Sequence, residues 1–467
     1  MPKEAADVST PQALLDVALE STTADSCVVL VRHASTANLR WANNTLTTNG
    51  VTTEVQMTVV SMVDGGQGAA VGVLTSSMTS PGQVRKLVSA ADQAARAAAP
   101  ASDASPLAEG DPSPDFDEPE ALTGLDGFMG FAERLGEAFG RANATKQLLY
   151  GYVEHDVTTT YLASSTGLRL RHEQPTGHIG ITQKPTDFSA SAWVGRAVEQ
   201  IDEIDVDSLT DELTRRVGWA KRRIDLPAGR YTTILPPTAV ADLAIYAYWV
   251  SGARDAFEGQ TVFSDPAGGT RVGQQVVKPG VRMHSDPYIC GLTACPFVLT
   301  TSSSSTASVF DNGLAIAPTS WIDDGVLRAL VTSRHTARLT SLDNTPGIDN
   351  LVVSVDGAAG SVEDLVADTD RGLLLTCLWY IREVDPHTLL LTGLTRDGVY
   401  LVEGGEVVGA VNNFRFNESP IDLLNRFSAA GETVRSFSRE WGDYFPRTAT
   451  PPLRIPDFNM STVSQAS

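Results

Sequence analysis

Apolar and polar residues alternate along much of the chain, which is the pattern of half-buried β-strands. Several such runs follow one another between residues 27 and 78. Asn49-Gly50 and Asp64-Gly65 interrupt them, and pairs of this kind favour tight hairpin turns. We therefore predict an antiparallel meander in this region, preceded by a short amphipathic helix over residues 11–24.

Other segments repeat apolar residues at every third or fourth position, which predicts helices. In residues 124–143, for example, Phe128, Phe131 and Leu135 would share one helix face. Helices are also predicted over residues 80–99, 189–201, 208–224, 238–259, 323–332 and 421–430.

Two further strands are predicted at residues 147–154 and 157–164, followed by a hairpin around Pro175 and Gly177. A Leu-Pro-Ala-Gly stretch at residues 226–229 then interrupts the periodic pattern of apolar residues. Strand patterns dominate after this point, so we place a domain boundary there, between residues 225 and 226.

Residues 100–120 break the periodic pattern. They contain five prolines and seven acidic residues. So little apolar surface favours a mobile surface loop. A calcium site is an alternative, but the prolines and the lack of EF-hand spacing argue against it.

The chain is acidic, with 35 Lys and Arg residues against 56 Asp and Glu residues and a formal net charge of −21. Such a surface repels phosphate backbones and anionic lipids, so we expect neither nucleic acid nor membrane as a partner. The most apolar run, residues 239–250, is shorter than the ~20 residues that cross a bilayer.

We expect a cytoplasmic protein. The first residues combine acids with a proline instead of the basic and apolar segments of a secretory signal. The four cysteines are too few for a disulfide framework in a chain of 467 residues.

The residues by themselves identify no self-contained catalytic site. His172-Glu173 with His178 contains the residue types of a zinc peptidase, but Pro175 and Gly177 intervene, and a zinc-binding helix needs both histidines on one face. The predicted helix 238–259 is nearly all apolar, has Asp242 as its only early charge and contains no histidine.

Segments spread over the whole chain resemble the TldD/PmbA family, in particular its TldE (PmbA) branch. The most specific of them is residues 370–420; the others are residues 35–50, 238–259, 328–337 and 450–458. The resemblance implies an α+β fold. It comprises an N-terminal α/β domain with an antiparallel sheet (residues 1–225) and a C-terminal β-rich domain of the TldD/PmbA type (residues 226–467).

In this family, TldD-type subunits hold zinc on a His-Glu-x-x-x-His helix, with a further cysteine ligand near the C-terminus. The corresponding helix positions here are near Ile245, Tyr246 and Val250. The cysteine would lie within residues 436–448, which contain none. The resemblance therefore implies no metal or other cofactor in this chain and no catalytic residues. Zinc is expected in a TldD-like partner subunit.

The resulting hypothesis is a non-catalytic TldE-like subunit of a heterodimeric zinc metallopeptidase that processes unfolded or extended peptides. One alternative is an independent metallopeptidase with scattered ligands such as His284, His335 and Cys377. Another is a stand-alone peptide-binding module, and a homodimer also stays open.

Three polar residues in one of the matching segments, Ser333, Arg334 and Thr336, are candidates for lining a peptide chamber. Arg334 is equally suited to a structural ion pair.

Overall fold

The N-terminal region is built around one long, curved antiparallel sheet. The computed structural model describes residues 10–66, 68–77 and 80–464. The sheet order is β3-β2-β1-β4-β5-β6. Its strands are β1 (Ser26–Ala42), β2 (Thr45–Asp64), β3 (Ala69–Ser77), β4 (Gln147–Ser164), β5 (Arg169–Pro185) and β6 (Ala192–Val198).

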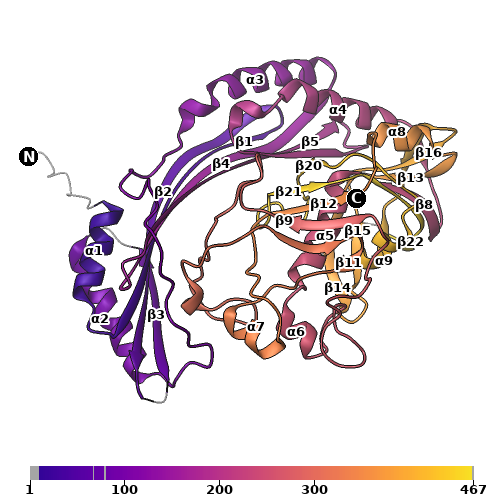
Figure 1. The fold of residues 1–467 in the computed structure, drawn as a ribbon. Coiled ribbons are helices and arrows are strands. Elements are labelled where there is room, and N and C mark those ends of the chain that lie inside the picture. The colour runs from indigo at the N-terminus through magenta and orange to yellow at the C-terminus, as the bar shows by residue number, and fades with distance from the viewer. Residues whose placement is uncertain (1–9, 67, 78–79, 465–467) are drawn as a thin grey trace, which may run out of the picture.

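Helices cover the convex face of this sheet, two at each end (Figure 1). They are α1 (Pro11–Ser21), α2 (Pro81–Ala97), α3 (Met129–Ala144) and α4 (Val206–Trp219). Leu14 and Val88 from α1 and α2 pack against one half of the sheet, and Leu135 and Leu213 from α3 and α4 against the other half. The concave side faces the C-terminal region.

The C-terminal region contains two more sheets. A six-stranded sheet has the order β11-β10-β9-β12-β21-β20. Its strands are β9 (Val281–Ser285), β10 (Thr319–Asp323), β11 (Val326–Leu327), β12 (Leu351–Val355), β20 (Val434–Ser436) and β21 (Thr448–Thr450).

A ten-stranded sheet follows the order β14-β15-β18-β22-β8-β13-β16-β17-β7, with β19 paired to β22. Its strands are β7 (Arg223–Ile224), β8 (Gly229–Leu235), β13 (Arg371–Leu375), β14 (Leu378–Asp385), β15 (Leu390–Thr395), β16 (Val399–Glu403), β17 (Glu406–Val411), β18 (Phe414–Glu418), β19 (Ala429–Ala430) and β22 (Leu453–Val463).

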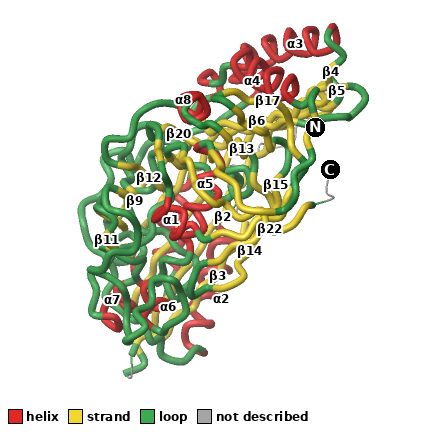
Figure 2. The backbone as a smooth tube through the Cα atoms, turned by 90° about the vertical axis from the view of Figure 1, so that its right-hand side faces the viewer, coloured by secondary structure: helices red, strands yellow, loops and turns green. Residues whose placement is uncertain are grey.

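Helix α5 (Pro237–Trp249) lies between these two sheets (Figure 2). It contacts β8 of the larger sheet and β12, β20 and β21 of the smaller one. A helix that is apolar on all sides is expected in such a buried position. The other helices here are short: α6 (Ala253–Phe257), α7 (Arg334–Thr340), α8 (Val362–Ala367) and α9 (Pro420–Arg426).

The α+β fold class and the antiparallel N-terminal sheet are confirmed. Helices lie where the periodicity predicted them at residues 11–24, 80–99, 124–143, 208–224 and 421–430, with ends shifted by a few residues. The predicted helix 238–259 divides into α5 and α6.

Several local predictions were wrong because pairing with a neighbouring strand decides the structure. The 189–201 helix is instead strand β6, which pairs with β5. The 323–332 helix is the β10–β11 hairpin, whose turn residues Asp324 and Gly325 both have positive φ.

Two predicted turns are also absent. Strand β2 continues through Asn49-Gly50, and the turn lies at Asn43-Asn44 instead. Strand β5 likewise runs without a turn through Pro175 and Gly177, since it pairs along its whole length with β4. The two strands predicted at residues 147–154 and 157–164 are likewise one strand, β4.

The acidic segment 100–120 contains no helix and no extended strand, as predicted, but it is fastened to the N-terminal region. The guanidinium of the buried Arg171 donates to the Asp115 carboxylate and the Pro119 carbonyl, both at 2.9 Å. The Gln12 side chain donates to the carbonyls of Phe116 and Glu118. Polar anchors therefore hold a segment that has too little apolar surface to pack by itself.

Candidate functional site

The helix at which the resemblance places a degenerate metal site is α5. Strand β8 leads into α5 through Pro236 and Pro237, and proline suits the first helical position because its φ is already close to the helical value. Most of the helix is buried, and Ile245 is fully so.

The loop of residues 436–448 packs against this helix. One oxygen of the Asp242 carboxyl, Oδ1, accepts hydrogen bonds from the Ser438 hydroxyl and, at 2.9 Å, from the Glu440 backbone N–H. The Trp441 indole N–H donates to the Asp242 carbonyl, also at 2.9 Å. The helix and the loop that would supply zinc ligands in a TldD-type subunit are therefore in direct contact.

Aromatic side chains complete the contact. The ring of Trp441 lies 5.8 Å from that of Tyr246 and 5.1 Å from that of Trp249, measured between centroids. Phe445 packs against Tyr248 and Trp249. Ile245 thus belongs to the core, Tyr246 packs on the loop, and Val250 is half-buried at the end of the helix.

The donor atoms at this place do not fit zinc, which prefers imidazole nitrogen and thiolate sulfur. The helix offers a single carboxyl, and burial raises the pKa of Asp242 to about 7. Its second oxygen, Oδ2, has no hydrogen-bond partner. Burial also raises the pKa of the nearby Cys377 thiol, to about 12, which disfavours the thiolate that a metal needs.

The scattered candidate ligands lie on separate elements: His284 on β9, His335 on α7 and Cys377 directly before β14. Across residues 10–66, 68–77 and 80–464, no three His, Cys, Asp or Glu side chains form a group arranged to hold a metal ion. His172 and His178 share β5 with Glu173, whose carboxylate pairs with Arg171.

The three candidate chamber residues lie at the start of α7. The Ser333 hydroxyl caps the helix by accepting from the Thr336 N–H, and the Thr336 hydroxyl donates to the Ser305 carbonyl. Arg334 pairs with the buried Asp311 at 2.6 Å and donates to the Phe310 carbonyl. Ser333 and Thr336 are buried, so these contacts assign all three a structural role in the chain by itself. Chamber lining stays a prediction.

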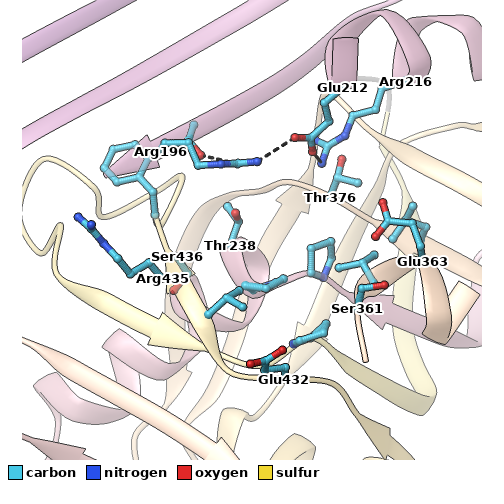
Figure 3. Close-up of a pocket in the computed structure, with 18 of the residues that line it drawn as sticks. Arg196, Glu212, Arg216, Thr238, Ser361, Glu363, Thr376, Glu432, Arg435 and Ser436 are labelled. Carbon is cyan, nitrogen blue, oxygen red and sulfur yellow. Dashed lines mark hydrogen bonds and ion pairs between the residues drawn. The ribbon is translucent and has the colours of Figure 1, made fainter. Parts of the chain in front are cut away.

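A cavity of about 680 Å³ lies between the N-terminal region and the C-terminal sheets (Figure 3). Its lining includes β6, α4, the start of α5 and the loop that contains Glu432. The Glu212 carboxylate joins Arg196 and Arg216. Burial acts to raise the pKa of Glu212, but the two guanidinium groups lower it below its usual value. Glu212, Arg196 and Arg216 therefore satisfy one another's charges.

A second cavity, of about 400 Å³, adjoins the 436–448 loop. Arg439 of this loop lies between the indole rings of Trp193 and Trp379. Sequence patterns do not predict this arrangement, because the three residues come from β6, β14 and the loop and meet only in the folded chain.

The sequence comparison identifies the family. The model described as the PmbA/TldA metallopeptidase C-terminal domain matches residues 228–462, which is half of the chain. The chain belongs to the TldD/PmbA family. That family is metallopeptidase-related. A search of curated proteins gives no match.

Solved structures show the same TldD/PmbA fold over nearly the whole chain. TldE from Thermococcus kodakarensis is similar with a TM-score of 0.73 and 16% identity, covering 96% of this chain and 99% of that one. A protein from Bacteroides thetaiotaomicron named as a candidate modulator of DNA gyrase gives 0.75 and 14%, covering 97% and 98%. Another so named, from Thermotoga maritima, gives 0.73 and 16%, covering 96% and 98%. In the described part of this chain, no helix is both long and apolar enough to span a membrane.

Proposed function

We propose that this chain is a non-catalytic, TldE-type subunit of a cytoplasmic zinc metallopeptidase that acts on unfolded or extended peptides. A TldD-type partner subunit supplies the zinc, the activated water and the general base. This chain supplies part of the wall of the peptide chamber.

The observation that carries the proposal is the contact between α5 and the 436–448 loop. The resemblance places the zinc ligands of a TldD-type subunit on these two elements. Their contact is made by Asp242, Ser438 and Trp441 in place of metal ligands. These contacts support a structural role for both segments in this chain.

The proposal is tested by reconstitution. The chain is purified alone and mixed with a TldD-type protein from the same cell, and cleavage of an unfolded polypeptide is followed with complex mass. We expect no cleavage by this chain alone and cleavage by the complex. A partner in which glutamine replaces the glutamate of the zinc helix should assemble normally and leave the complex inactive.

Two outcomes would overturn this assignment. Cleavage that continues with the glutamine-substituted partner would place the catalytic groups in this chain. A stable homodimer that never joins the TldD-type protein would favour a stand-alone peptide-binding module.

A further inference from the structure

Several aromatic side chains line the cavity beside the 436–448 loop. They come from both the curved sheet and the C-terminal region: Tyr150, Tyr152, Trp193, Trp379 and Phe437, with His178 stacked on Phe437 at 5.4 Å. Its volume of about 400 Å³ falls in the size range of small-ligand sites. It suits the end of a peptide, not a folded protein.

Arg439 is fixed in this cavity by two indole rings. Its guanidinium carbon lies 4.6 Å from the ring centroid of Trp193 and 4.6 Å from that of Trp379. The two rings hold the guanidinium in place by cation–π contact, and its N–H donors lie in the plane of the group. The edge of such a group matches a carboxylate.

No carboxylate of the described residues forms an ion pair with Arg439, and its buried Nε has no hydrogen-bond partner. Inside the protein its charge reaches the buried Cys377 thiol and Asp242 carboxyl and acts to lower the pKa of both. Buried N–H groups usually have partners, and an unpartnered one leaves a donor for a ligand or a water. The arginines of the larger cavity differ, since Arg196 and Arg216 both pair with Glu212.

The acidic side chains nearby are engaged elsewhere or lie at the rim. The Glu440 carboxylate accepts from the backbone N–H groups of Tyr380 and Ile381 and pairs with Arg382 at 3.1 Å. The Asp242 carboxyl is bound by Ser438 and Glu440. Asp443 is a rim residue, with 82% of its side chain exposed. The exposed Arg40 adds a second positive charge to the lining.

Strand addition does not explain recognition here, because the nearby strand edges are capped. Trp193 and Trp379 lie on β6 and β14, the edge strands of their two sheets. Arginine side chains occupy β6 carbonyls, including that of Trp193, and Glu440 occupies two N–H groups of β14. A peptide must therefore be bound chiefly through its side chains and its terminal group.

We propose that Arg439, clamped between Trp193 and Trp379, binds a peptide carboxylate, with the C-terminal carboxylate of an extended peptide as its ligand. The aromatic walls then receive the last apolar side chain. This inference rests on the proposed function for its substrate class and adds a subsite for the peptide end.

The test is a binding measurement on this chain alone, read from tryptophan fluorescence, so it does not depend on zinc or cleavage. Three tryptophan-free probes are used. Two have the sequence N-acetyl-Gly-Ala-Leu, one with a free C-terminus and one amidated. The third is amidated and has glutamate in place of alanine. We expect the free acid to bind about tenfold or more tightly than the plain amide. The glutamate-containing amide distinguishes a side-chain carboxylate from a terminal one.

Arg439→Gln should abolish this preference. Arg215→Gln is the matched control, because Arg215 also stacks on an indole, that of Trp219, yet pairs with Glu363. Should Arg439→Gln fail to fold, Trp379→Leu removes one side of the clamp and should also reduce the preference.

Equal binding of the acid and the plain amide would overturn the proposal, as would a preference that persists in Arg439→Gln or Trp379→Leu. Tightest binding of the glutamate-containing amide would overturn the assignment of the ligand to the peptide terminus.

Discussion

The indole Nε1–H of Trp441 donates a hydrogen bond of 2.9 Å to the backbone carbonyl of Asp242. This bond joins the 436–448 loop to the middle of α5. Trp441→Phe keeps most of the ring packing and removes the bond, so we expect a loss of about 1 kcal/mol in the free energy of unfolding. Trp441→Ala also removes the packing and should cost roughly 3–5 kcal/mol.

Denaturant unfolding measures both effects. Trp249→Phe is the control, since Trp249 is more exposed and should tolerate the change. Equal stability of Trp441→Phe, Trp441→Ala and the unchanged chain would show that the loop does not depend on this contact.

Asp242 makes the folded chain less stable as the pH rises. Burial raises the pKa of this carboxyl to about 7 in the folded state, whereas the unfolded chain releases the proton near pH 4. Between these values the folded state binds more protons, so its stability falls with increasing pH and the effect levels off above pH 7. Asp242→Asn removes this dependence and should gain about 2–3 kcal/mol relative to the unchanged chain between pH 5 and pH 8.

The measurement is the difference in unfolding free energy between the two proteins across this pH range. Asp443→Asn, at an exposed carboxylate, is the control substitution. A constant difference between Asp242→Asn and the unchanged chain would mean that Asp242 titrates as an ordinary carboxyl.

The ion pair between Arg334 and Asp311 should be structural. Asp311 is buried, so Arg334→Ala leaves a buried charge without its partner and should cost roughly 3–5 kcal/mol. Arg254→Ala, at a solvent-exposed pair with Glu258, should change stability little. Thermal unfolding compares the two. An Arg334→Ala protein of unchanged stability that loses only partner-dependent peptide cleavage would instead favour the chamber-lining role.

Arg171 should hold the acidic segment 100–120 against proteolysis. Its guanidinium joins Asp115, Glu173 and the Pro119 carbonyl. Arg171→Gln should therefore let a protease specific for acidic residues cut the segment about tenfold faster, because local opening controls access. Arg141→Gln, which removes an exposed pair with Asp207, should leave the rate unchanged. Rapid cutting of the unchanged chain would instead indicate that segment 100–120 is a mobile loop.

Local periodicity correctly predicted helices whose buried face is formed by residues of a single segment. The spacing of Phe128, Phe131 and Leu135 predicted a helix, and these side chains form one buried cluster under α3. The same reasoning failed for residues 189–201, because the edge of β5 was available to pair with them. Asn49-Gly50 likewise predicted a turn, but the pairing of β1 with β2 continues through both residues.

The candidate site divides in the same way. Family resemblance pointed to the α5 positions and to the loop near residues 436–448, and the structure brings these two elements together. The Arg439 clamp was not predictable, since Trp193, Trp379 and Arg439 are far apart in the sequence and each is unremarkable alone. Ser333 and Thr336 are polar, which suggested that they line a chamber. In the structure Ser333 caps α7 and both residues are buried.

The central claim is that this chain does not itself hold the catalytic zinc. The most direct test is elemental analysis of the isolated protein after incubation with zinc and removal of the free metal. We predict far less than one zinc per chain, with no change in Asp242→Asn or Cys377→Ser. One tightly bound zinc per chain, lost in either variant and accompanied by chelator-sensitive peptide cleavage, would contradict the account.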